Sequence, residues 1–404
     1  MAPLALVQAR YSSSRLLGKV LAPIAGVPML LRVVARVRQA ATLTQVVVVT
    51  SDQPSDDAVV ACCTAAGVPV FRGALADVLD RFYRAACQFG GDPIVRVTAD
   101  CPLIDPAVID QVVRAYQQGG VDYATNTLPP TYPDGLDVEV FSRAALARAH
   151  AEARRPSERE HVTPYLRQAP GLRRLNVAHV PDLSPRGLQW SVDTAADLAF
   201  VRAVYAHLGE GSFGLPEVLA LLEREPVLHT IQPARISNEG YYRSLYREAQ
   251  AERSTAPGSD VASLLIDFTR PGAATPAGET LTWLGQRLQD GFNALAAEAG
   301  LGGRVASAGP PLAARLHFRD AQGRPDAALA ARFRWEAARR GIRVRDRHQL
   351  HPDHSYQTIE QALRAYAAVF HALAAQPAAP EDTGTLAAPA GRPAGQRTGK
   401  EMHP

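Results

Sequence analysis

The sequence predicts a mixed α/β fold, with a mostly parallel sheet covered on both faces and a second, smaller α+β domain. Two runs of β-branched residues, at 46–50 and 94–98, show no polar alternation, as expected of strands buried on both faces. Helical spacing of apolar residues between such runs gives a repeated β-α-β order. This alternation stops near residue 250, and a chain of 404 residues is long enough for two or three domains of roughly 150 residues.

The elements of the first domain follow from the change of hydrophobic period along the chain. Helices show apolar residues three and four apart, whereas the strands are short apolar runs. Asp105 followed by Pro106 is typical of an N-cap and a first helical residue. The predicted order is strand 4–9, helix 29–39, strand 46–50, helix 57–66, strand 68–71, helix 78–89, strand 94–98, helix 105–117, strand 187–192 and helix 198–208.

A different pattern begins near residue 250. Residues 251–260 are polar and contain Gly and Pro, which is typical of a linker. The pattern beyond them predicts helices at 280–300, 327–340 and 358–375 and a strand at 315–319, a compact module of a size usual for a small domain. The predicted organisation is a first domain at 1–248, a linker at 249–260, an α+β domain at 261–375 and a disordered tail rich in Ala, Pro, Gly and Thr at 376–404.

The composition excludes several classes of partner. Apolar residues make up 47% and charged residues 21%, enough for a sizeable core without metal or disulfide staples. A net charge of +3 does not argue for a nucleic-acid binder, and no apolar run approaches the roughly 18 residues of a membrane span. The amino terminus is predicted to be a strand rather than a signal peptide. Cys62, Cys63, Cys87 and Cys101 show no disulfide-like spacing, so a cytoplasmic protein with reduced thiols is expected.

Positive charge is concentrated in the loop after the first strand. Arg10, Arg15 and Lys19 lie among serines at the carboxyl end of a parallel strand, where α/β sheets bind ligands. Cations, hydroxyls and backbone amides together suit a polyphosphate, and a solvated basic loop is the alternative. Of 43 basic residues only Lys19 and Lys400 are lysines, so a lysine retained here indicates a site that needs a compact charge. We expect Arg15 and Lys19 to be exposed.

Residues 9–19 match the pattern A-R-x-x-S-x-R-L-x-x-K, which is a signature of the sugar-acid cytidylyltransferases. By this motif the first 248 residues resemble that family. That family includes the CMP-Kdo and CMP-acylneuraminate synthetases, and the resemblance is strongest to its spore coat polysaccharide biosynthesis protein F branch. Further motifs fit in order and spacing at Phe71–Gly73, Asp77–Arg81, Thr98–Pro106, Tyr132–Phe141, Ser157–Pro164 and Trp190–Thr194.

The resemblance implies a Rossmann-like nucleotide-diphospho-sugar transferase sheet. It implies an enzyme that joins CTP to an acidic sugar, gives a CMP-sugar and pyrophosphate, and serves surface or spore-coat polysaccharide synthesis. It also implies Mg2+ held by Asp100 and Asp193, whereas Asp197 is expected to cap a helix from Thr194. The implied nucleotide-binding residues are Ala9, Arg10, Ser13, Ser14, Arg15, Lys19, Arg72, Arg81 and Asp100, of which Arg10, Arg15 and Lys19 are also assigned to catalysis. The implied acceptor-binding residues are Asp137, Glu139, Arg159 and His161, the last two as cations for an acceptor carboxylate.

Several of these residues have an ordinary structural alternative. Arg72 and Arg81 also fit salt bridges on a helix, and Asp100 also fits a turn at the end of a strand. The spacing from Ser157 to Glu160 is that of a capping box, so Glu160 is either a cap or a substrate contact.

Residues 258–375 resemble the small C-terminal domain of class III aminotransferases, in the segments 288–296, 333–342 and 354–360. No lysine in this module can form a Schiff base with pyridoxal phosphate, so we expect it to be non-catalytic and dispensable. His348, His351, Asp353 and His354 have no helical spacing, which favours a solvated loop over a metal site. A fold remnant and a docking surface for an aminotransferase partner are the open interpretations of the module, and a homodimer is an open interpretation for the whole chain. For the whole chain, the alternatives are another nucleotide or acceptor, or a non-catalytic scaffold.

Overall fold

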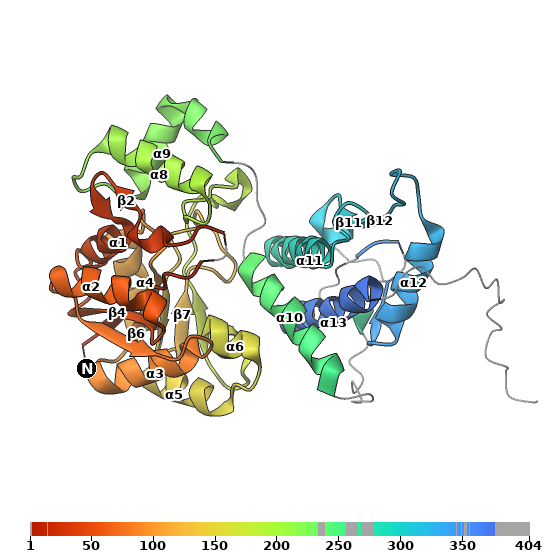
Figure 1. Cartoon of the computed structure of the whole chain (residues 1–404), viewed down its shortest axis with the longest axis horizontal. Coiled ribbons are helices and arrows are strands. Elements are labelled where there is room, and N and C mark those ends of the chain that lie inside the picture. The colour runs from red at the N-terminus through yellow and green to blue at the C-terminus, as the bar shows by residue number, and fades with distance from the viewer. Residues whose placement is uncertain are drawn as a thin grey trace, which may run out of the picture.

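The computed structural model describes residues 2–13, 15–232, 239–255, 266–267, 278–344, 346–348, 350, 354 and 356–375. These residues form two bodies, each around its own apolar core (Figure 1). The first contains a seven-stranded sheet in the order β5-β4-β1-β6-β8-β7-β9. The predicted α/β class is confirmed, with a parallel centre and antiparallel pairing only where β8 joins β6 and β7.

The parallel centre of the sheet determines where the loops gather. Its register places Gln8 beside both Val49 and Thr98, so the carboxyl ends of β1, β4 and β6 lie at one edge. The strands are β1 (Leu4–Gln8), β4 (Gln45–Ser51), β5 (Val70–Gly73), β6 (Ile94–Thr98), β7 (Tyr123–Thr125), β8 (Glu139–Phe141) and β9 (Arg174–Asn176), with a separate hairpin of β2 (Pro23–Ile24) and β3 (Val27–Pro28).

Helices cover both faces of this sheet because each presents an apolar stripe to it. One core cluster includes residues of α1, α4, α8 and α9, and the other includes residues of α3 and α5. The helices are α1 (Met29–Val37), α2 (Asp57–Ala65), α3 (Val78–Phe89), α4 (Pro106–Gly119), α5 (Arg143–Glu152), α6 (Pro156–His161), α7 (Pro164–Gln168), α8 (Ala195–Leu208) and α9 (Leu215–Arg224).

The prediction of a strand at 187–192 is wrong, because the backbone of this segment pairs with loops rather than with a strand of the sheet. Only an isolated bridge joins Gln189 to Asp134. The backbone amide of Trp190 donates to the carbonyl of Asp134 at 2.7 Å, and that of Val192 donates to the carbonyl of Asp100 at 2.8 Å. This backbone pairing holds the end of the segment against the end of β6.

The second body is built from four helices around an aromatic core. Phe292 makes edge-to-face contacts with Phe333, Tyr366 and Phe370, with centroids 5.0–5.5 Å apart. His348 is buried beside this cluster, 2.9 Å from the hydroxyl of Tyr366, so a solvated loop is wrong for this histidine. The elements are α10 (Glu239–Thr255), β10 (Ile266–Asp267), α11 (Gly278–Glu298), β11 (Val305–Ala308), β12 (Arg315–Phe318), α12 (Ala327–Ala338), β13 (Ile342–Arg343) and α13 (Tyr356–Ala374).

Helix α10 crosses the predicted domain boundary at residue 248. It contributes Tyr242 and Leu245 to the second core and continues as helix through 249–255, where a linker was predicted. Residues 256–260, His351, Asp353 and the tail 376–404 lie outside the described residues. None of the described helices is long and apolar enough to span a bilayer.

Candidate active site

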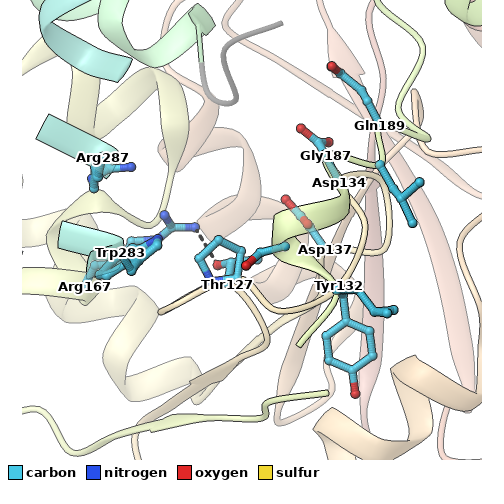
Figure 2. A pocket seen from close by; sticks show the side chains of 13 residues that line it. Thr127, Tyr132, Asp134, Asp137, Arg167, Gly187, Gln189, Trp283 and Arg287 are labelled. Carbon is cyan, nitrogen blue, oxygen red and sulfur yellow. Dashed lines mark hydrogen bonds between the residues drawn. The ribbon is translucent and has the colours of Figure 1, made fainter. Parts of the chain in front are cut away.

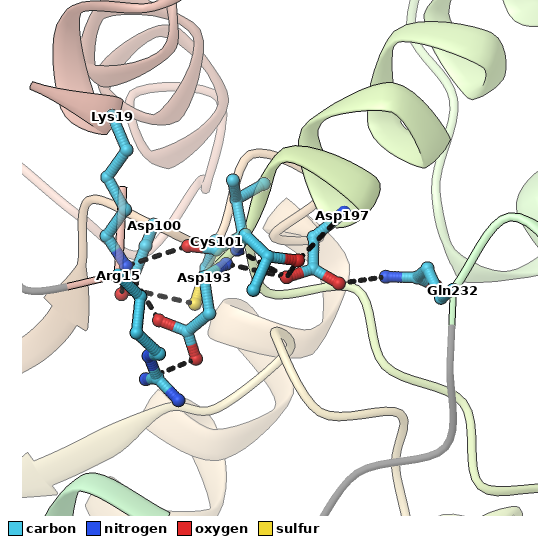
Figure 3. Close-up of polar contacts among 9 residues, drawn as sticks. Arg15, Lys19, Asp100, Cys101, Asp193, Asp197 and Gln232 are labelled. Atoms are coloured by element: carbon cyan, nitrogen blue, oxygen red, sulfur yellow. Dashed lines mark hydrogen bonds and ion pairs between the residues drawn. The ribbon is translucent and has the colours of Figure 1, made fainter. Parts of the chain in front are cut away.

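Lys19 is the centre of a charged cluster at the carboxyl edge of the sheet. Its Nζ donates to Oδ2 of Asp100 and Oδ1 of Asp193, both at 2.8 Å, and to the carbonyl of Val192 at 2.7 Å (Figure 3). These three bonds use all the donors of an ammonium group. Lys19 is only 7% exposed, so the expectation of an exposed lysine is wrong, because the two carboxylates draw it into the fold.

Two segments far apart in the sequence bring the carboxylates together. Asp100 follows β6, and the bond from the Val192 amide to the Asp100 carbonyl places Asp193 beside it. Arg15, from the loop after β1, approaches the other oxygen of Asp193 at 2.7 Å. The cluster therefore joins two cations to two carboxylates.

The charges in the cluster stabilise one another. Burial opposes the ionised form of Asp100, but the ammonium of Lys19 and hydrogen bonds from Thr98 and the backbone together outweigh burial and lower the pKa of Asp100 to about 2. Burial likewise opposes the charge of Lys19, and the carboxylates of Asp100 and Asp193 outweigh it and raise the pKa of Lys19. Both groups are therefore ionised at neutral pH.

Asp197 is the helix cap that the sequence predicts. Its Oδ2 accepts from the backbone amides of Asp193 at 2.9 Å and Thr194 at 2.7 Å, in a capping box that begins α8. Its Oδ1 accepts from Nε2 of Gln232 at 2.9 Å. Asp197 is fully buried, so it orients the backbone of Asp193 rather than facing a ligand.

Asp100 and Asp193 fit a divalent cation by the chemistry of their donors. Both carboxylates line one pocket and bond to the same nitrogen, and their side chains are 29% and 19% accessible. Carboxylate oxygens are ligands that suit Mg2+, which usually retains several water molecules as ligands and also binds substrate phosphates. Among the described residues no group of three or more His, Cys, Asp or Glu could hold a metal.

The pocket over this cluster is lined by further cations. Arg10 and Ser13 line it from the first loop, and Arg243 and Arg247 line it from α10. Ala9 is buried at the end of β1, with its amide bonded to the carbonyl of Val49 at 3.0 Å. Ser14 lies outside the described residues. The structure thus brings Arg10, Ser13, Arg15, Lys19, Asp100 and Asp193 together around one pocket.

Arg72 and Arg81 are bound to nearby backbone and do not line this pocket. Arg72 donates to the carbonyls of Ser51 at 3.0 Å and Gln53 at 2.9 Å and pairs with Asp57 at 2.7 Å. Arg81 is 1% exposed and donates to the carbonyl of Ala74 at 3.0 Å. Arg72 lies in β5 rather than on a helix, and the acceptors of Arg81 are backbone carbonyls, so nucleotide binding by these two residues stays a prediction.

A buried carboxylate that the sequence analysis missed holds the first loop. Asp56 accepts from the backbone amide of Tyr11 at 2.6 Å and from the amide of Ser51 at 2.9 Å. It thereby joins the cation-bearing loop to the end of β4. The contact with Tyr11 spans 45 residues, so no local spacing marks it.

Glu139 is bound by protein groups on all sides. Arg96 and Tyr123 both donate to it, and Arg167 lies 2.7 Å away. Burial opposes its charge, but the two arginines hold the pKa of Glu139 well below its usual range. Glu139 lines a second pocket, which shares Thr98 and His161 with the pocket over Lys19. Its carboxylate is already satisfied, so it orders Arg96 and Arg167.

The two residues expected to supply acceptor cations are bound to protein groups in this structure. Arg159 donates to Asp77 at 2.7 Å and to two backbone carbonyls. It lines neither of the two pockets that His161 lines. His161 lies 3.0 Å from the hydroxyl of Ser244, and burial lowers its pKa to about 4 despite the opposing charge of Glu160. It is therefore neutral at pH 7.

The capping interaction in this region uses another glutamate. The box at the start of α6 pairs Arg155 with Glu158, whereas Glu160 accepts from the hydroxyl of Ser244 at 2.8 Å. Glu160 also lines the pocket over Lys19. The cap interpretation is therefore wrong for Glu160.

Asp137 faces open space beside the sheet. Figure 2 shows it with Asp134 on one side of a pocket whose other side carries Arg167. Its side chain is exposed to the pocket, yet the surrounding protein and the carboxylates of Asp134 and Glu139 raise its pKa. Asp137 was predicted to bind the acceptor, and its carboxylate faces open space in the pocket.

Comparison with known proteins covers the first body. A family model described as cytidylyltransferase matches residues 4–200. Spore coat polysaccharide biosynthesis protein SpsF of Bacillus subtilis is 35% identical over 229 residues, which are 55% of this chain and 94% of that protein. The 3-deoxy-manno-octulosonate cytidylyltransferase of Anaeromyxobacter sp. strain K is 34% identical over 176 residues, 40% of this chain and 71% of that protein.

A solved structure agrees with these sequence matches. A cytidylyltransferase from Leptospira borgpetersenii superposes with a TM-score of 0.54 at 30% identity, over 58% of this chain and 98% of that one. The likeness to an aminotransferase domain remains an expectation from the sequence.

Proposed function

The chain belongs to the cytidylyltransferase family, and on that premise we propose that it joins CTP to an acidic sugar, giving a CMP-sugar and pyrophosphate. The observation that carries the proposal is the cluster of Lys19 and Arg15 with Asp100 and Asp193. In the reaction a sugar hydroxyl oxygen bonds to the α-phosphorus of CTP, the bond to pyrophosphate breaks, and the hydroxyl proton is released.

The cations of the first loop have a defined role in this proposal. Arg10, Arg15 and Lys19 line one pocket and neutralise the negative charge that grows on the phosphates in the transition state. Cationic hydrogen-bond donors held in a fixed direction lose little energy to reorganisation when the charge develops. Lys19 contributes its charge rather than a hydrogen bond, because Asp100, Asp193 and the carbonyl of Val192 already accept from its three donors.

Asp100 and Asp193 would hold Mg2+, which supplies charge neutralisation and orients the α-phosphate for in-line displacement. Asp197 supports this arrangement by bonding the backbone of Asp193.

An acidic acceptor is supported by the relatives and by the charges beside the cluster. One relative is named for 3-deoxy-manno-octulosonate and another for spore coat polysaccharide synthesis, and these names support a role in surface polysaccharide synthesis. Arg96 and Arg167 line the neighbouring pocket and can attract a carboxylate. We place the reaction in the cytoplasm, where CTP is made, and the four cysteines are free thiols.

The test is pyrophosphate release with CTP, UTP, ATP and GTP against 3-deoxy-manno-octulosonate, N-acetylneuraminate and a neutral hexose. We expect release that needs Mg2+, CTP and a sugar acid together. Release with another nucleotide, or with the neutral sugar alone, would replace the substrate assignment. Asp193→Asn is the inactive reference protein.

A further inference from the structure

The second body supplies one wall of the pocket on the acceptor side. Two adjoining hollows of about 140 and 180 Å3 share Asp137, Arg167 and Arg287. Trp283 of α11 completes the first hollow and Tyr356 of α13 completes the second. Figure 2 shows Trp283 and Arg287 on the side of the pocket opposite Asp137.

We propose that Arg287 binds the carboxylate of the acceptor and that Trp283 and Tyr356 cover its sugar ring, so that the appended domain selects the acceptor. This inference rests on the proposed function, because it concerns the second substrate of the same reaction. It replaces the expectation that the module is dispensable.

Buried contacts fix the direction of the Arg287 guanidinium. Its Nε donates to Oε1 of Glu360 at 2.5 Å, and Glu360 also accepts from the hydroxyl of Tyr241 at 2.7 Å. The rings of Tyr241, Tyr242 and Tyr356 lie 5.0–5.7 Å from its central carbon. A guanidinium has five donor hydrogens in a rigid fork, so a group oriented in this way is suited to bidentate binding of a carboxylate.

The two aromatic rings of the wall are parallel and hold each other in place. Trp283 and Tyr356 stack with centroids 5.7 Å apart and an interplanar angle of 5°. The C–H face of a sugar ring packs well on such a surface, whereas its hydroxyls need polar partners. Asp134 and Asp137, on the far side of the pocket, offer carboxyl oxygens to those hydroxyls.

The pocket is continuous with the phosphate site. Thr98 and His161 line both the second hollow and the pocket over Lys19. An acceptor with its carboxylate at Arg287 can thus extend toward the α-phosphate bound beside Lys19. Its chemical class is a sugar acid with hydrogen-bond donors at the end opposite the carboxylate.

The wall is attached to the catalytic domain by polar contacts. Glu248 of α10 accepts from the backbone amide of Ser157 in α6. Arg364 of α13 lies 3.2 Å from the same Glu248 and 3.4 Å from the hydroxyl of Ser157. These contacts fix α13, and with it Tyr356, against the first body.

The test measures KM for CTP and for the sugar acid of the panel that the wild-type chain turns over fastest. Arg287→Met is expected to raise the acceptor KM by about ten- to a hundredfold, the effect of losing a charge-assisted bond. Trp283→Ala loses ring packing instead and is expected to raise it by about three- to tenfold. The KM for CTP should stay within about twofold, since a general loss of structure would change both values. Arg287→Lys keeps a charge beside Glu360 but loses the fork, so its acceptor KM should be intermediate.

Matched controls come from the same module. Arg340→Met removes a partner of Glu336 in α12, and Trp335→Ala removes a tryptophan that is 53% exposed. Neither side chain lines the two hollows, and both variants should keep the wild-type KM values. If Arg287→Met does not fold because Glu360 is left unpaired, Arg287→Lys and Trp283→Ala carry the test.

The outcomes separate the two proposals. An active wild-type chain whose Arg287 and Trp283 variants keep the acceptor KM within about twofold overturns this inference alone. A wild-type chain that releases no pyrophosphate with any member of the panel overturns the proposed function, and this inference with it.

Discussion

Replacing Lys19 by Met should inactivate the enzyme and destabilise the fold together. The variant leaves Asp100 and Asp193 facing each other without the ammonium that both now bond at 2.8 Å. In the wild-type chain the pKa of Asp100 is about 2 instead of its ordinary 3.8, and this difference corresponds to about 2 kcal/mol of stability. Because the Asp100 side chain is 29% accessible, that figure is an upper estimate for this pair.

The direction of the pKa shift determines how the loss of stability in Lys19→Met should depend on pH. A carboxylate with a lowered pKa in the folded state contributes stability above its unfolded pKa and loses it as pH falls through the folded pKa. The stability gap between the wild-type chain and Lys19→Met should therefore be full at pH 7 and shrink between about pH 4 and pH 2.

The assay is urea unfolding at several pH values beside pyrophosphate release at pH 7. Turnover should fall by at least about tenfold, since one cation facing the phosphates is lost. Arg84→Met is the control, because Arg84 is 68% exposed and pairs only with Asp80 of its own helix among the described contacts. Wild-type turnover in Lys19→Met would refute the assignment of the site, and unchanged stability at pH 7 would refute the electrostatic reasoning.

Three further predictions follow from single contacts. Asp193→Asn should abolish turnover, whereas Asp197→Asn should keep turnover within about tenfold of the wild-type value. Asp197→Asn should lower the free energy of unfolding by about 2 kcal/mol, at the upper end for a helix cap, because Asp197 is fully buried. An equally inactive Asp197→Asn would show that the carboxylates are misassigned. His161 has a pKa of about 4 against an ordinary 6.5, so stability should decline as pH falls from 6.5 to 4. In urea titrations His161→Gln should remove about 3 kcal/mol of that decline at most. An identical decline in the variant would contradict the buried neutral histidine. Arg159→Met should lower the melting temperature but leave both KM values unchanged, because Arg159 bonds Asp77 and two carbonyls; a raised acceptor KM would restore its assignment to the substrate.

The sequence was most informative where function depends on the ends of strands. Lys19 and Asp100 lie in a loop and a turn next to β1 and β6, and parallel pairing puts both at the same edge. Asp197 was predictable from a spacing of three residues, because a capping box is a local interaction.

The acceptor side was less predictable because its contacts are long-range. Arg159 meets Asp77 across 82 positions, and Arg167 meets Glu139 across 28. No local pattern shows that these charges are already paired, or that burial keeps His161 neutral. The contribution of Arg287 depends on how α11 and α13 pack against the first body, which residue spacing does not encode.

The most direct test of the central claim follows the α-phosphate itself. CTP labelled with 32P at the α-position is incubated with Mg2+ and the sugar acid, and the products are separated by mass and charge. We predict that the wild-type chain and Asp197→Asn transfer the label to a CMP-sugar, and that Asp193→Asn leaves it in CTP. Label found only in free CMP, or transfer by Asp193→Asn at the wild-type rate, would contradict cytidylyl transfer at the Lys19 cluster.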